Sequence, residues 1–197
     1  MAGHNSPHPT MESFQKINTS YEQYYATLKE KGIHSHKETE KGFWLSSVSI
    51  EVFDLFRTIG LEQFNHFADL GSGDGKVALI ASVFTKSTGI EFDQELVKRS
   101  IQIKEEIGAN NLRFKKGDFL EEDLSAYDIL FVYPDNPLVR LEQKLLKEFR
   151  GDLIVCGGIY PPERLVKKRV VQINNAVFGI YRRGWLSGYF TGRRWKA

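Results

Sequence analysis

The sequence predicts an α/β fold in which a mostly parallel sheet lies between two layers of helices. Short apolar runs with strand character alternate with longer amphipathic runs between residues 66 and 156, and this alternation is typical of a parallel sheet with crossover helices. A glycine-rich turn follows the first of these strands, and a hairpin pattern ends the sheet. We expect strands near 66–70, 87–92, 112–116, 127–132 and 152–156, and helices near 75–84, 94–107 and 137–149.

Local signals set the limits of the later elements. Asp93 is suited to cap the helix over 94–107, and Gly108 to end it. The helix over 137–149 carries apolar residues along one side, namely Leu138, Leu141, Leu145 and Phe149. Asn174 and Asn175 separate two apolar runs, 170–173 and 177–181, which favours a hairpin. Between the fifth and sixth strands only residues 161–167 remain for a helix.

The first 60 residues form a separate, more helical section. Residues 1–12 are polar and predict a flexible leader, and residues 14–31 predict a helix that ends at Gly32. Residues 34–41 predict a polar connector, because nothing beyond the alternating His34, His36, Glu38 and Glu40 supports a metal site. A second helix is expected from Ser46 or Ser47 to Thr58, with its apolar residues Val48, Val52, Phe56 and Ile59 on one face.

Composition is that of a soluble globular protein in a reducing compartment. The 197 residues suit one domain, with 41% hydrophobic and 26% charged residues. No apolar stretch approaches 20 residues, and residues 1–10 lack the pattern of a signal peptide. A single cysteine, Cys156, lies in an apolar run, where a buried structural thiol is expected. We therefore expect a cytoplasmic protein.

Charge is distributed unevenly along the chain. From Glu163 onward nine basic residues face one acidic residue, a net charge of +8 against −6 for the rest. Four aromatic residues are interleaved with them, namely Trp185, Tyr189, Phe190 and Trp195. Such a basic, aromatic end can bind RNA or another acidic partner. The reading we favour is a solvated last strand followed by a tail that packs on its own domain.

The residues Asp69-Leu70-Gly71-Ser72-Gly73-Asp74-Gly75 form a strand-to-helix turn of the kind that binds nucleotides. Glycine removes the Cβ atom where backbone passes close to a ligand, and it permits the positive φ of a tight turn. Several cofactor folds share a GxGxG turn, so the turn by itself leaves the ligand open. The acidic residues within and after the turn indicate which ligand it binds.

Glu91 follows Gly71 by 20 residues and ends the second strand, a position suited to both hydroxyls of a ribose. A pyrophosphate would be repelled by Asp74 inside the turn, whereas Asp69 and Asp74 together suit a cationic ligand with an ammonium and a sulfonium group. A third station, Asp118 with Phe119, can bind an exocyclic amine and cover an adenine ring. The spacing therefore fits S-adenosylmethionine better than NAD.

These motifs resemble those of the class I S-adenosylmethionine-dependent methyltransferases. The resemblance covers residues 43 to 183 and rests on DLGSGDGKV, GIEFD, KGDF and DILFVYP. It implies a three-layer Rossmann-like fold in which six parallel strands are joined by an antiparallel seventh. Within the superfamily, the GSGDG turn and the run after the fifth strand are most similar to archaeal protein-lysine methyltransferases. We expect three sections: an arm and helix (1–41), a methyltransferase domain (42–183) and a basic tail (184–197).

The resemblance also implies a set of cofactor-binding residues. They are Asp69, Gly71, Ser72, Gly73, Asp74, Gly75, Glu91, Phe92, Asp118, Phe119 and Trp44. In similar enzymes a segment before the first strand folds over the cofactor, which is the role expected of Trp44 or Phe43. An aromatic residue there is also a common core residue.

The fourth strand ends at Tyr133-Pro134-Asp135-Asn136-Pro137, which should border the reacting methyl group. This run resembles, in a different order, the Asn/Asp-Pro-Pro-aromatic signature of amino-group methyltransferases. The resemblance implies that Asp135 or Asn136 orients an amine, while Tyr133 accepts a proton or walls the pocket. Alternatively, Asp135 caps a helix that starts near Pro137.

The leading hypothesis is a methyltransferase that acts on a protein nitrogen, most simply that of lysine. Tyr133-Pro134-Asp135 also resembles the Phe-Pro-Asp of tRNA guanine-N7 methyltransferases, but the Trp and Lys/His cluster expected after it is missing. A polyamine synthase shares an Asp in the glycine turn, yet the acidic motif expected after its fourth strand is absent. A catalytically silent subunit that keeps the fold to bind a partner is the remaining alternative.

Overall fold

The computed structural model describes residues 11–32, 36–39, 42–45 and 47–184, with side chains for 11–32 and 47–184. Its helices are α1 (Met11–Glu30), α2 (Ser49–Ile59), α3 (Lys76–Ala81), α4 (Gln94–Ile107) and α5 (Val139–Glu148), with short 3-10 turns η1 (Leu61–Gln63) and η2 (Leu124–Ala126). The strands are β1 (His36–Thr39), β2 (Gly42–Leu45), β3 (His66–Leu70), β4 (Lys86–Glu91), β5 (Leu112–Lys116), β6 (Ile129–Val132), β7 (Asp152–Cys156), β8 (Val166–Ile173) and β9 (Ala176–Arg182).

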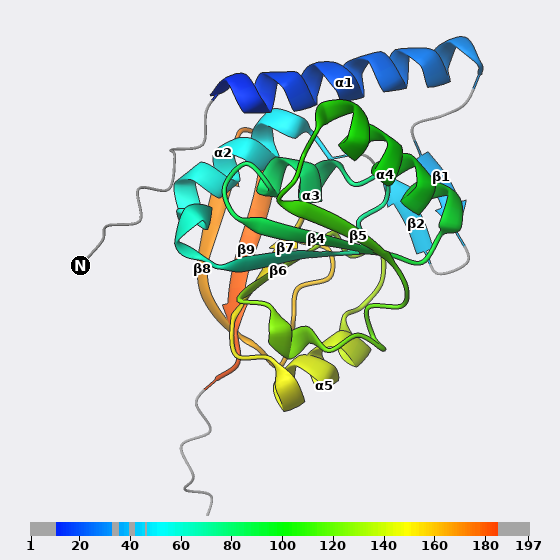
Figure 1. Ribbon diagram of the computed structural model, residues 1–197. Coiled ribbons are helices and arrows are strands. Elements are labelled where there is room, and N and C mark those ends of the chain that lie inside the picture. The colour runs from blue at the N-terminus through cyan, green and yellow to red at the C-terminus, as the bar shows by residue number, and fades with distance from the viewer. Residues whose placement is uncertain (1–10, 33–35, 40–41, 46, 185–197) are drawn as a thin grey trace, which may run out of the picture.

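Seven strands form one sheet in the order β5-β4-β3-β6-β7-β9-β8. Strands β3 to β7 are parallel to one another. Strand β9 lies between β7 and β8 and is antiparallel to both. The predicted α/β fold, with six strands in one direction and an antiparallel seventh, is confirmed. Figure 1 shows α1 to α4 on one face of the sheet and α5 on the other.

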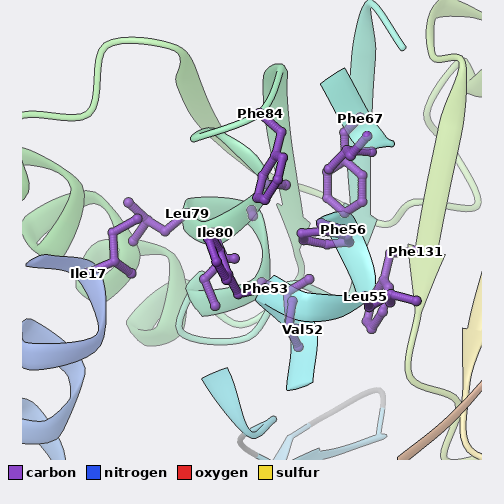
Figure 2. Close-up of a cluster of buried hydrophobic side chains, with 14 of the residues drawn as sticks. Ile17, Val52, Phe53, Leu55, Phe56, Phe67, Leu79, Ile80, Phe84 and Phe131 are labelled. Atoms are coloured by element: carbon purple, nitrogen blue, oxygen red, sulfur yellow. The ribbon is translucent and has the colours of Figure 1, made fainter. Parts of the chain in front are cut away.

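The two faces of the sheet have separate cores because successive side chains of a strand point to opposite sides. Phe67 of β3 and Phe131 of β6 belong to the core beneath α1 to α4, whereas Ala68 and Leu130 belong to the core beneath α5. The first core is rich in aromatic residues, and Phe56 lies 5.3 Å from the ring of Phe67 (Figure 2). Truncating such a fully buried phenylalanine costs about 3–5 kcal/mol.

Helix α1 packs into this first core. Its buried residues Phe14, Ile17 and Tyr21 recur at helical spacing, and the Phe14 ring stacks on Phe53 of α2 at 4.3 Å. In Figure 2 Ile17 approaches Leu79 of α3. The predicted helix over 14–31 exists but begins three residues earlier, so Met11 and Glu12 are helical. This helix is thus part of the folded body.

One expectation about an irregular segment is wrong in part. The polar connector over 34–41 contains β1, which pairs with β2 as an antiparallel hairpin with His36 opposite Leu45. Alternating residue types suit a strand, and only the pairing partner decides between a strand and a coil. Residues 157–165, between β7 and β8, contain no helix in the structure. No helix among the described residues is long and apolar enough to cross a bilayer.

The C-terminal hairpin is longer than predicted and is tied to β7 by ion pairs. Asn174 takes a positive φ of 50° at the tip of the hairpin. Its first strand begins at Val166 and its second strand ends at Arg182. The buried carboxylate of Asp152 binds Lys168 at 3.0 Å and Arg182 at 2.7 Å. Part of the basic C-terminal charge is therefore neutralised within the sheet. The tail from Trp185 onward, with its aromatic residues, lies outside the described residues, and the three predicted sections stay predictions.

Candidate active site

The predicted site residues gather at one edge of the sheet, which we call the carboxyl edge. Strands β3, β4, β5 and β6 are parallel and end there, with Leu70 opposite Ile90 and Val132, and Glu91 opposite Lys116. The segments that follow these strands are therefore neighbours, although they lie far apart in the sequence. This edge is where open α/β sheets bind ligands.

The glycine turn, residues 71–75, leaves β3 in a tight left-handed path. Gly71, Gly73 and Gly75 have φ values of 77°, 55° and 86°, which residues with a Cβ atom rarely adopt. The N–H groups of Gly71 and Ser72 both donate to the Ile90 carbonyl, at 2.9 and 3.0 Å, and that of Gly75 donates to the Ser72 carbonyl at 2.9 Å. These donors are committed within the chain, so they do not form the cradle of N–H groups that a pyrophosphate requires.

The turn has a filled side and an open side. A Cβ atom on Gly75 would lie 2.6 Å from the Ser100 side chain and would also meet the ring of Phe114, which blocks a Cβ atom on Gly89 as well. A Cβ atom on Gly71, in contrast, would have no atom of the described residues within 4 Å. The backbone at Gly71 is thus the part of the turn that a ligand can approach. Phe114, whose ring fills the other side, was not among the residues that the sequence indicated.

Glu91 holds the turn against the end of β4. One carboxylate oxygen accepts the N–H of Gly73 and the other that of Asp93, both at 2.8 Å, and the side chain is buried. Because each carboxylate oxygen offers two lone pairs, these bonds leave acceptor capacity for the predicted ribose hydroxyls. Phe92, which follows, is half-buried.

Two further carboxyl groups are buried close to Glu91. Burial raises the pKa of Asp69 well above its usual range, and the negative charges of Glu91 and Asp74 raise it further. Burial also raises the pKa of Asp74, while the hydroxyl of Tyr25 and the ammonium of Lys76 lower it. Asp74 is directed toward α1, where Tyr25 donates to its carboxylate at 2.6 Å. Asp69 is therefore the acid whose negative charge would gain most from a bound cation.

The third predicted station lies at the end of β5. The Gly117 N–H donates to the Glu91 carbonyl at 2.9 Å, so this station is fixed beside the second. Asp118 is half-buried and accepts the N–H of Leu120 at 2.9 Å. Phe119 packs at the border of the core beneath α5. The structure brings both residues to the carboxyl edge, and their contacts with an adenine stay predictions.

The predicted acceptor side is more exposed. Tyr133 is 47% exposed, and Asp135 and Asn136 lie at the surface, where the Asn136 amide donates to Asp135 at 3.0 Å. Asp135 does not occupy the N-cap position of the next helix, as the alternative expected, because α5 starts at Val139 and its N-cap residue is Leu138. The run from 133 to 136 is thus a surface segment that leaves the carboxyl edge.

A further acid near this edge, Glu51 in the first turn of α2, was not indicated by the sequence. Burial raises the pKa of Tyr133, and its neighbours Cys156 and Glu51 raise it further. Burial and Glu51 also raise the pKa of Cys156 to about 12, so this thiol stays protonated, as a structural cysteine does. Glu51 comes 40 residues before Glu91, and only the packing of α2 brings it here. The side chain of Trp44, in β2, lies outside the described residues.

Comparison with known proteins identifies the fold. No family model matches the chain. An RNA methyltransferase from Salinibacter ruber, solved in complex with S-adenosyl-L-homocysteine, superposes with a TM-score of 0.62 at 23% identity, covering 70% of this chain and 93% of that one. The chain has the class I methyltransferase fold. A variant of MtNAS in complex with S-adenosylmethionine gives a TM-score of 0.59 at 14% identity, covering 87% of this chain and 71% of that one.

One curated relative shares sequence with part of this chain. EEF1A lysine methyltransferase 2 from Mus musculus is 30% identical over 91 residues, which cover 40% of this chain and 37% of the mouse protein. The match thus spans well under half of that relative.

Proposed function

We propose that the protein binds S-adenosylmethionine and transfers its methyl group. The observation that carries the proposal is the pairing of an open backbone at Gly71 with the buried acids Asp69 and Glu91. A cation bound there would favour the charged form of Asp69, which burial and its neighbours now disfavour. When bound, the cofactor supplies an activated methyl group on a positively charged sulfur.

The arrangement of donors also favours this cofactor over a dinucleotide. The N–H groups of Gly71, Ser72, Gly73 and Gly75 all donate to acceptors of the chain. A pyrophosphate would find no free donors at these positions and would meet two buried carboxyl groups, which repel it. An S-adenosyl group needs acceptors for an ammonium and for ribose hydroxyls, and Asp69 and Glu91 are acceptors.

We further propose that the methyl acceptor is a protein amino group, that of lysine. The partial match to a mouse lysine methyltransferase supports this choice. On the acceptor side, the exposed Asp135 and Asn136 offer oxygens that can orient an amine. Because the pKa of Tyr133 is raised, its hydroxyl stays protonated at neutral pH and serves as a wall and hydrogen-bonding group. The role of a base for the amine proton then falls to Asp135 or to water.

Two measurements test the proposal. Calorimetry should show binding of S-adenosylmethionine and S-adenosylhomocysteine but not of NAD. Incubation with methyl-labelled cofactor and a total lysate should then label material that protease removes and nuclease does not. A double variant, Asp135→Ala with Asn136→Ala, should bind cofactor normally yet label far less protein. Absence of cofactor binding by the wild type would refute the proposed function.

An RNA acceptor is the second candidate. The Salinibacter ruber neighbour is named an RNA methyltransferase, and the last 35 residues of this chain carry a net charge of +8. Lys168 and Arg182 are paired with Asp152, which reduces the charge that this end presents to a partner. Label in nuclease-sensitive material would favour RNA. Cofactor binding without label in any fraction would favour a silent subunit.

A further inference from the structure

Helix α1 contacts the glycine turn through two tyrosine hydroxyls. The Tyr21 hydroxyl donates to the backbone carbonyl of Asp74 at 2.8 Å, and the Tyr25 hydroxyl donates to its carboxylate at 2.6 Å. The residues are about 50 positions apart in sequence, and Figure 1 shows α1 lying across α3, which follows the turn directly. The backbone carbonyl and the carboxylate of one turn residue are therefore bound by the same helix.

The contact is electrostatic as well as geometric. The Lys76 ammonium lies 4.8 Å from the centre of the Tyr25 ring and 5.7 Å from that of Tyr21, and it is buried. Rings over which a cation sits stabilise it by about 0.5–2 kcal/mol. The Asp74 carboxylate accepts the Tyr25 hydroxyl, and the charge of Lys76 lowers its pKa, which burial raises. The four groups form a closed unit that joins the turn to α1.

The docking of α1 does not by itself require this unit. Phe14 and Ile17 bury the helix in the core, and the Lys16 ammonium donates to the Ile107 carbonyl at 2.7 Å. Tyr25 is half-buried, and its hydroxyl binds the buried Asp74. A short hydrogen bond to a buried carboxylate is among the stronger ones in proteins. This bond therefore restrains the glycine turn, to which Asp74 belongs.

Asp74 sits between the two glycines that set the shape of the site. Gly73 donates to the Glu91 carboxylate at 2.8 Å, and Gly75 takes a φ of 86° beside Phe114. A displacement of Asp74 would shift the adjoining residue Gly73, whose N–H donates to Glu91. We infer that Tyr25 is a positioning residue of the cofactor site, which holds Asp74 so that the turn and Glu91 keep the geometry that binds the S-adenosyl group. The inference rests on the proposed function.

The test compares two tyrosines of the same helix. Tyr25→Phe removes the hydroxyl that binds Asp74, whereas Tyr24→Phe removes one from the neighbouring ring, which lies 5.2 Å away and faces Arg99. Calorimetry with S-adenosylhomocysteine should show an affinity about tenfold lower for Tyr25→Phe and within about twofold of wild type for Tyr24→Phe. In turnover assays, KM for the cofactor should rise, while kcat and KM for the acceptor stay near wild type.

A double-mutant cycle separates positioning from general destabilisation. Asp74→Leu has a side chain of similar shape without an acceptor, and Tyr25→Phe added to it should lower affinity little further, because both changes remove the same contact. Additive losses, or equal losses for Tyr24→Phe and Tyr25→Phe, would overturn the inference and leave the proposed function standing. A wild-type protein that fails to bind S-adenosylhomocysteine would overturn both.

Discussion

The carboxylate of Glu91 accepts the N–H of Gly73 at 2.8 Å, so the end of β4 and the glycine turn are held by one side chain. Its second oxygen accepts the N–H of Asp93. Asp93 is the N-cap of α4, and its side chain accepts the N–H groups of Glu95 and Leu96. The predicted ribose ligand is therefore also a structural link between β3, β4 and α4. Glu91 is therefore expected to contribute both to cofactor affinity and to the free energy of unfolding.

Replacing Glu91 tests both parts. In Glu91→Gln the amide has one acceptor atom, so either Gly73 or Asp93 loses its partner, and the free energy of unfolding should fall by about 1–3 kcal/mol. Affinity for S-adenosylmethionine should fall at least about tenfold, because ribose hydroxyls bind a charged acceptor more strongly. Calorimetry and urea unfolding measure the two effects. Glu95→Gln, an exposed partner of Lys98, should change neither. Normal cofactor affinity in Glu91→Gln would remove the ribose assignment.

Two glycines of the turn should respond in opposite ways to alanine. Gly75→Ala places a Cβ atom at a φ of 86° against Ser100 and Phe114, and should destabilise the fold by more than about 2 kcal/mol. Gly71→Ala has the space for its Cβ atom and should cost about 1–2 kcal/mol through its positive φ. Because that Cβ atom occupies the open side, Gly71→Ala should fold and yet bind no cofactor. A folded Gly71→Ala variant with wild-type affinity would place the ligand elsewhere.

The charged carboxyl group of Asp69 is expected to lower the stability of the fold and to strengthen cofactor binding. Its folded-state pKa is raised, so above that pKa the charged carboxyl destabilises the fold, and below the unfolded-state pKa the cost disappears. Asp69→Asn should therefore raise the midpoint of thermal unfolding at pH 7 by about 2–4 °C, which is the change that 1 kcal/mol produces in a chain of this size. The gain should shrink as pH falls and the wild-type carboxyl becomes protonated. Calorimetry should show weaker S-adenosylmethionine binding at pH 7. A less stable Asp69→Asn protein would contradict this account.

Lys76 should make stability depend on alkaline pH. Burial lowers its pKa from 10.5 to about 8, while the charge of Asp74 acts in the opposite direction. Below pH 8 the ammonium is charged in the folded and the unfolded state. Burying this charge then lowers the free energy of unfolding by its full amount, at most about 3 kcal/mol. Between about pH 8 and 10.5 only the unfolded state keeps the proton, so the stability of the wild type should rise relative to Lys76→Met. Unfolding midpoints of the two proteins from pH 7 to 9.5 measure this, and parallel curves would show an unshifted lysine.

Much of the fold could be predicted because its signals are local. The strands at 66–70, 112–116 and 152–156 and the helix at 94–107 have the predicted limits, since each is a short apolar run or lies between a cap and a stop. Asp93 does accept the N–H groups of Glu95 and Leu96, and Gly108 takes the left-handed conformation that ends α4. The hairpin of β1 and β2 was missed because β1 is a polar run of four residues, His36–Thr39, and only its pairing with β2 makes it a strand.

The sequence alone determined the order of strands and helices, the glycine turn and the acids at the strand ends, because these depend on residues a few positions apart. Only the tertiary structure decided which groups face one another. It turned Asp74 toward Tyr25, brought Glu51 to the carboxyl edge, and placed the ring of Phe114 against Gly75 and Gly89. Contacts between residues about 25 to 100 positions apart form when helices pack on a sheet, and no pattern within a single element records them.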